Sequence, residues 1–143
     1  MKANIKPAII GLIIILVLAF MICFIKYQET DQYNKLVKDL KEKGAKVEEV
    51  GDYQHVSFSA EIKKHIRIEG DSVFVFEYKN IESAELDASK ISGDASRMAG
   101  SIMIWFSTPH LYKKDGLIIL YLGNNKKVIS FLEEVLGEQF AGA

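Results

Sequence analysis

The sequence predicts an α+β protein in which an N-terminal transmembrane helix precedes one antiparallel sheet with helices packed on one face. Two observations predict this class. Residues 8–25 contain no charge, whereas all acidic residues lie in the rest of the chain. Two later segments rich in strand-forming residues each predict a hairpin, and an Asn that can cap a helix follows each of them. The expected order after the anchor is roughly α-β-β-β-α-β-β-α.

Length and composition limit the possible functions. A chain of 143 residues has room for one ordinary domain with an appendage. One Cys excludes an internal disulfide framework, and one Cys with three His excludes a cysteine-rich zinc site. Residues 27–143 hold 15 basic and 19 acidic residues, a net charge of −4, so no positive excess favours nucleic acid. We expect no metal, no cofactor and no nucleic-acid partner.

Residues 8–25 are expected to cross a lipid bilayer as a signal anchor. Eighteen helical residues span about 27 Å, close to the bilayer's hydrocarbon core of about 30 Å. Nothing in this stretch offers the polar face of a soluble core helix. Residues 1–7 would form a short tail and residues 26–143 the remaining domain. The anchor side chains are expected to include Ile9, Leu12, Leu16, Phe20 and Phe24.

Two alternatives to a retained anchor stay open. A cleaved signal peptide would need a small-x-small cleavage site, and none follows Phe20. Cys23 stands where a lipoprotein cysteine would, but the three residues before it lack a small side chain. The basic residues on the two sides do not decide the orientation. Because a short N-terminal tail usually stays inside, we expect a cytoplasmic N-terminus and an extracytoplasmic domain in the cell membrane.

The first half of the domain predicts one helix and three strands. Thr30 and Asp31 can cap a helix that runs to about Lys43. Its apolar stripe is Tyr33, Leu36, Val37 and Leu40. Residues 45–60 predict one or two short strands only weakly. A hairpin is expected next, with Gly70-Asp71 as its turn.

The second half predicts the second hairpin and two further helices. Asn80 can cap a short helix over 81–91, and 92–100 is loop by composition. Residues 101–108 predict an apolar strand that Pro109 ends or bends.

A polar turn over 113–116 then leads into a buried strand over 117–122. Asn124 or Asn125 can cap the last helix, 126–136. The two hairpins followed by helices suggest a possible ββα pseudo-repeat.

Two runs carry a family resemblance, the W-x-x-T-P-H run of 105–110 and the L-G-x-Q-F-A-G run of 136–142. With them the chain resembles a family of small, uncharacterised bacterial exported proteins that have a membrane or lipoprotein anchor and one α+β domain. The resemblance covers about residues 36–142. It implies location and fold, and it transfers no activity and no catalytic residue. The chain departs from the family by carrying Arg97 and Met98 in its loop and by lacking a lipobox.

His110 is the strongest candidate for chemistry, because an imidazole titrates near neutral pH and can act as base or ligand. A structural role in the chain turn remains its alternative. Ser107 and Thr108 beside it form no nucleophile elbow, and the chain has no glycine-rich phosphate-binding motif. We therefore expect no catalytic residues and a non-enzymatic protein.

Four residues are candidates for a ligand or partner surface: Trp105, His110, Tyr112 and Arg97. The expected function is a membrane-tethered extracytoplasmic binding domain of unknown ligand. Its partners would be the lipid bilayer through residues 8–25 and an envelope protein or a second copy. One alternative is a small-molecule sensor or hydrolase-like pocket around Trp105 and His110. Another is a structural, self-assembling envelope protein.

A row of aromatic residues offers a second possible partner surface. Strand alternation places Phe74, Phe76 and Tyr78 on one face of their strand and Val73 and Val75 on the other. If nothing covered the aromatic face, it would be an exposed apolar patch. The alternative is a sheet covered on both faces.

Overall fold

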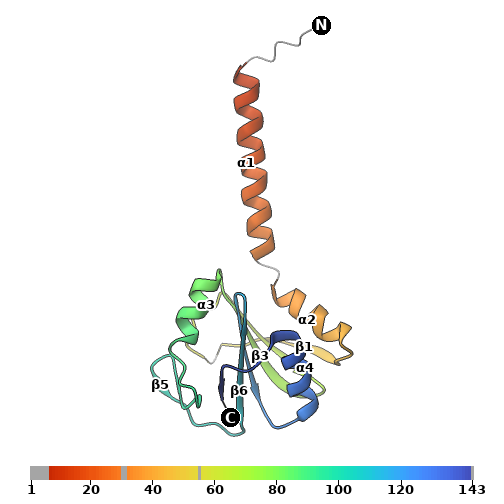
Figure 1. Ribbon diagram of the computed structural model, residues 1–143, viewed down its shortest axis with the longest axis vertical. Helices are drawn as coiled ribbons and strands as arrows, with labels where there is room; N and C mark the ends of the chain where they lie inside the picture. Colours follow the sequence, from red (N-terminus) through yellow and green to blue (C-terminus); the bar gives the residue numbers. More distant parts are fainter. Residues whose placement is uncertain (1–6, 30–31, 55, 143) are drawn as a thin grey trace. The chain divides into compact units, whose positions relative to one another are not determined.

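The computed structural model describes residues 7–29, 32–54 and 56–142 (Figure 1). The chain divides after Asp31 into two units, of which the first contains α1 and the second every other element. The elements are α1 (Pro7–Glu29), α2 (Gln32–Glu42), β1 (Val47–Asp52), β2 (Ile62–Ile68), β3 (Asp71–Glu77), α3 (Ile81–Ala88), β4 (Arg97–Met98), β5 (Ser101–Ile102), β6 (Pro109–Lys114), β7 (Leu117–Leu122), α4 (Lys126–Leu136) and β8 (Ala141–Gly142).

Helix α1 is a single helix of 23 residues. Its large apolar side chains over 9–22 are exposed on all sides of the helix, Ile9, Leu12, Leu16 and Phe20 among them. The side chain of Phe24 lies outside the described residues. Within the described parts of the chain, no helix combines the length and the apolar character needed to cross a membrane.

The second unit is built on an antiparallel sheet, as the sequence predicts. Over the described residues the sheet has six strands in the order β1-β2-β3-β7-β6-β8. Its two central strands, β3 and β7, pair Val73 with Tyr121 and Glu77 with Leu117. The turn between β2 and β3 is formed by Glu69 and Gly70, both with positive φ, one residue earlier than expected.

Helices pack on both faces of the sheet, so the prediction of one covered face is wrong (Figure 1). Helices α2 and α4 cover the face that carries Val73 and Val75. Helix α3 and the segments around it cover the face that carries Phe76 and Tyr78. Because β3 is apolar on both sides, burial of either side alone would leave the other in water. Phe76 and Tyr78 are fully buried, so the aromatic face is part of the core and not a partner surface.

Both predicted Asn caps are confirmed. The Asn80 side chain accepts a hydrogen bond from the Ser83 amide, and that of Asn125 accepts one from Lys127. Helix α3 ends at Ala88, three residues earlier than expected. The amides of Lys90 and Ile91 donate to carbonyls three residues back instead of four, and Ile91 is buried after this turn. The ββα repeat holds for the order of elements, but α3 and α4 lie on opposite faces of the sheet.

The predicted caps of the first domain helix, Thr30 and Asp31, lie outside the described residues. A residue from the sheet caps α2. The buried Glu77 carboxylate accepts hydrogen bonds from the amides of Gln32 at 3.2 Å and Tyr33 at 3.3 Å. A carboxylate at this place satisfies helix N–H groups that have no partner within the helix. Glu77 thereby fastens the start of the domain to its central strand.

The strand predicted over 101–108 is wrong for most of its length. Only Ser101–Ile102 pair, in the short hairpin β4–β5. Pro109 starts β6 and pairs with Leu122, so it neither ends nor bends an existing strand. Proline fits the first position of a strand because it has no N–H to donate. Residues 103–108 are left outside the sheet.

Candidate functional site

The segment from Ile102 to Phe106 carries the most exposed large apolar side chains in the second unit. Ile102, Ile104 and Phe106 are 76%, 86% and 101% exposed. Between them, Met103 and Trp105 pack against the core under α3. The three exposed side chains therefore alternate along the chain with the two packed ones. We call Ile102, Ile104 and Phe106 the apolar ridge.

The inward residues hold this segment to the domain. The indole N–H of Trp105 donates to the carbonyl of the buried Ala95 at 2.8 Å. The amide of Met103 donates to the carbonyl of Ser96 at 2.9 Å. These two hydrogen bonds and the β4–β5 pairing fix the backbone under the ridge. The ridge is therefore an ordered surface and not a loose apolar loop.

The polar loop of residues 92–97 bonds to the segment of 102–106 through Ala95 and Ser96. The Asp94 carboxylate accepts hydrogen bonds from the Ser92 hydroxyl at 2.6 Å and the Ser96 amide at 3.0 Å. The same two contacts, led by the Ser92 hydroxyl, lower the pKa of Asp94 to about 2. The Ser92 oxygen also accepts a hydrogen bond from the Arg97 amide. The loop of 92–97 is thus held by its own serines and aspartate.

The surroundings of the ridge contain few charges along the chain. No charged residue occurs from Met98 to Tyr112. Arg97 is exposed and pairs in register with Ile102, at one end of the ridge. The predicted surface residues Trp105 and Arg97 therefore both belong to this region.

His110 lies in the interior, where the two sequence runs meet. It is 6% exposed, and its Nδ1 is 2.7 Å from Oε1 of Gln139. Its ring stacks on Tyr121 with centroids 5.7 Å apart. Its backbone pairs with Gly142 of β8 at the edge of the sheet. A Cβ at Gly142 would overlap the carbonyl of Pro109, so only glycine allows this close approach.

These contacts give His110 a structural setting. Its described partners are an amide, a phenol ring and the backbone, and none is a carboxylate or a thiol. Tyr112 is fully buried in the core under α2 and α4, on the other side of the sheet from Trp105. The structure therefore places Trp105 and Arg97 in one region, and Trp105 packs on the opposite face of the sheet from Tyr112.

The ridge residues themselves were not among the predicted site residues. The sequence predicts an apolar strand over 101–108, because residues 102–106 are all apolar. Pro109 was the signal available in the sequence: if Pro109 opens the strand, the preceding apolar residues need another location. No group of three His, Cys, Asp or Glu side chains among the described residues is placed to hold a metal ion.

Comparison with known proteins gives no match. No protein-family model, no curated protein and no solved structure is similar to this chain. The family resemblance of the W-x-x-T-P-H and L-G-x-Q-F-A-G runs stays a prediction.

Proposed function

We propose that this protein is a membrane-tethered, extracytoplasmic and non-enzymatic binding protein, and that its apolar ridge contacts a partner protein of the cell envelope. The ridge is the observation that carries the proposal. Three large apolar side chains are exposed to solvent, and hydrogen bonds hold the backbone that carries them. Contiguous apolar side chains on a surface are typical of interaction sites.

Burial of the three ridge side chains would supply enough free energy for the centre of a protein–protein interface. Burial of one Ile or Phe side chain contributes about 1.5 to 3 kcal/mol. Three such residues would supply several kcal/mol before the entropic cost of association is subtracted. A few central apolar or aromatic residues commonly provide most of the affinity of a protein–protein contact.

The tether rests on the character of α1. A helix that is apolar on every side is usually buried in a large core or in a membrane. The described side chains of α1 are large and apolar on every side of the helix. The uncharged run of 8–25 fits the same assignment. The tail of residues 1–7 would then stay in the cytoplasm.

The ridge segment and the start of the second unit occupy different parts of the fold. The domain begins at Gln32, whose side chain accepts a hydrogen bond from Gly116 at the β6–β7 turn. The ridge segment precedes Pro109, which starts β6, whereas Gly116 follows the other end of that strand. Met103 and Trp105, which alternate with the ridge residues, pack on the opposite face of the sheet from α2.

Photo-cross-linking in intact cells tests the proposal. A photoreactive amino acid replaces Ile104 in the full chain, and the control carries it at Val50, which is also exposed but lies on β1. We expect adducts with another envelope protein from position 104 and none from position 50. Failure of Ile102, Ile104 and Phe106 alike to give an adduct would overturn the proposal. An adduct of two copies of the chain would support the self-assembling alternative instead.

Thiol labelling tests the location separately. The variant Lys114→Cys places a thiol at an exposed position at the end of β6. We expect a membrane-impermeant maleimide to label this thiol in intact cells as well as in lysed cells. Labelling only after lysis would place the domain in the cytoplasm and overturn the proposed orientation.

A further inference from the structure

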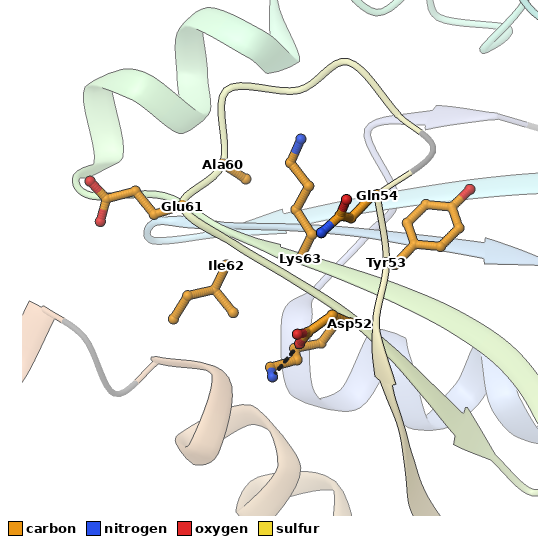
Figure 2. A pocket seen from close by; sticks show the side chains of 8 residues that line it. Asp52, Tyr53, Gln54, Ala60, Glu61, Ile62 and Lys63 are labelled. Atoms are coloured by element: carbon orange, nitrogen blue, oxygen red, sulfur yellow. Dashed lines mark hydrogen bonds and ion pairs between the residues drawn. The ribbon is translucent and has the colours of Figure 1, made fainter.

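A cleft of 470 Å³ opens where β1 ends and β2 begins (Figure 2). Asp52 pairs with Lys64 in the sheet, and the Tyr53 amide donates to the Lys63 carbonyl at 2.9 Å. The chain leaves the sheet after Tyr53 and returns at Ile62. The cleft lies between the two strand ends and the connection that joins them. Its volume lies within the range of small-molecule sites in proteins.

The far side of this connection is fastened to the domain. Val56 and Phe58 are buried, and the Phe58 ring meets Phe76 edge to face at 4.9 Å. The Ser59 amide donates to the Asp87 carboxylate at 2.7 Å. Because these contacts hold the connection down, the wall of the cleft is formed before any ligand arrives.

Lys63 supplies a positive charge in this cleft that takes part in no ion pair among the described residues. Its side chain is partly buried, and its Nζ donates to the carbonyl of Val56 at 3.1 Å. No ion pair recorded among the described residues includes Lys63, whereas the neighbouring Lys64 is paired with Asp52 at 2.6 Å. An ammonium has three N–H donors, so two remain beyond the bond to Val56.

The neighbouring side chains leave this charge accessible from the cleft. Figure 2 shows the Lys63 side chain extending into the space under the connection, with the Gln54 side chain beside it. The Glu61 carboxylate points away from Lys63. A partly desolvated cation without a counter-charge is stabilised when an anion binds to it.

We propose that this cleft binds a small organic anion, whose acidic group pairs with the Lys63 ammonium and whose second polar group bonds to the Gln54 amide. The acidic group is a carboxylate or a phosphate ester. The site is separate from the apolar ridge and goes beyond the proposed function. It gives the domain a small-molecule ligand in addition to a protein partner.

Titration of the full chain in lipid nanodiscs tests the site by NMR. The probes are succinate and glycerol 3-phosphate, which distinguish a carboxylate from a phosphate ester. Succinamide and glycerol are the neutral controls. We expect at least one anion to shift the Gln54 side-chain amide signal in a saturable way, and neither neutral compound to do so. Absence of a saturable shift with both anions would overturn the proposal.

Variants of Lys63 test whether anion binding depends on this residue. Lys63→Met removes the charge but keeps most of the side chain, and we expect it to weaken binding about tenfold or more, as for loss of a charged hydrogen bond. Lys63→Arg should retain binding. Lys79→Met is the matched control, because Lys79 is exposed and lies outside the cleft. Equal binding by wild type and Lys63→Met would overturn the assignment. If Lys63→Met does not fold, the binding of succinate to Lys63→Arg is compared with that of succinamide. Equal binding of the two compounds would then overturn the assignment.

Discussion

The carboxylate of Asp87 accepts hydrogen bonds from both the amide and the hydroxyl of Ser59, at 2.7 and 2.9 Å. Lys90 adds a third bond at 2.9 Å. Asp87 is on α3 and is 2% exposed, whereas Ser59 lies in the connection between β1 and β2. One buried carboxylate thus joins two segments that cover the same face of the sheet.

This contact predicts a pH dependence of stability. Burial raises the pKa of Asp87, but the Ser59 amide, Lys90 and the Ser59 hydroxyl together outweigh it and lower the pKa below 3.8. A lowered pKa in the folded state gives stability that is present above the unfolded pKa and is lost as pH falls through the folded one. We therefore expect wild type to melt at a higher temperature than Asp87→Asn at neutral pH, and the difference to shrink below about pH 4.

Asp115→Asn is the control for this titration, because Asp115 lies in an exposed turn where Asn also accepts the positive φ of 52°. Its melting temperature should follow that of wild type at every pH. A difference between wild type and Asp87→Asn that stays constant down to pH values well below the folded pKa would contradict the prediction.

Glu77 predicts a stability effect at the start of the domain. Glu77→Ala removes the acceptor for the Gln32 and Tyr33 amides, and we expect it to lower the free energy of unfolding by about 1 to 3 kcal/mol. Urea unfolding followed by the fluorescence of Trp105, the single Trp of the chain, measures the change. Glu48→Ala, at an exposed position of β1, should change it by less than about 0.5 kcal/mol. Equal effects of the two substitutions would exclude the capping role.

Substitution of His110 distinguishes a structural role of this residue from a catalytic one. His110→Ala removes the stacking on Tyr121 and leaves a cavity under β8, so we expect a loss of about 2 kcal/mol or more. Gln139→Ala should cost about 1 kcal/mol, because it removes only the partner of Nδ1. Thermal unfolding of both variants gives the comparison. Loss of a cellular phenotype in His110→Ala at an unchanged melting temperature would support the hydrolase-like alternative instead.

Substitutions in the apolar ridge are expected to abolish partner binding without lowering the stability of the domain. Ile104→Ser and Phe106→Ser should change the free energy of unfolding by no more than about 0.5 kcal/mol, since both side chains are exposed in the folded state. The same substitutions should abolish the cross-links formed from Ile102. Trp105→Ala should destabilise the domain, because its indole is packed and hydrogen-bonded. Destabilisation of similar size by Phe106→Ser would show that the ridge is part of the core.

Local signals in the sequence predicted most elements of the fold. The caps Asn80 and Asn125 depend on residues within one turn of each helix start, and the structure has both. The apolar run of 117–122 predicted a buried strand, and β7 is buried in the centre of the sheet. These features need no knowledge of distant residues.

The remaining features depend on distant contacts. The face that each helix covers is decided by packing between segments far apart in the chain, and the sequence gives no local signal for it. The pattern of apolar residues also does not distinguish a strand from the segment of 102–106, where one side packs and the other stands in water. His110 and Gln139 meet only because β8 returns to β6, 29 residues later in the chain.

The pairing of β3 with β7 also sets the order of events during synthesis. Val73 and Tyr121 are 48 residues apart, so the centre of the sheet cannot close until β7 has left the ribosome. At about 5 to 20 residues per second, β3 waits about 2 to 10 s for its partner. During this interval the apolar sides of β3 lack the cover that α3 and α4 later provide. The nascent chain therefore has an aggregation-prone stage that a chaperone or rapid export would have to protect.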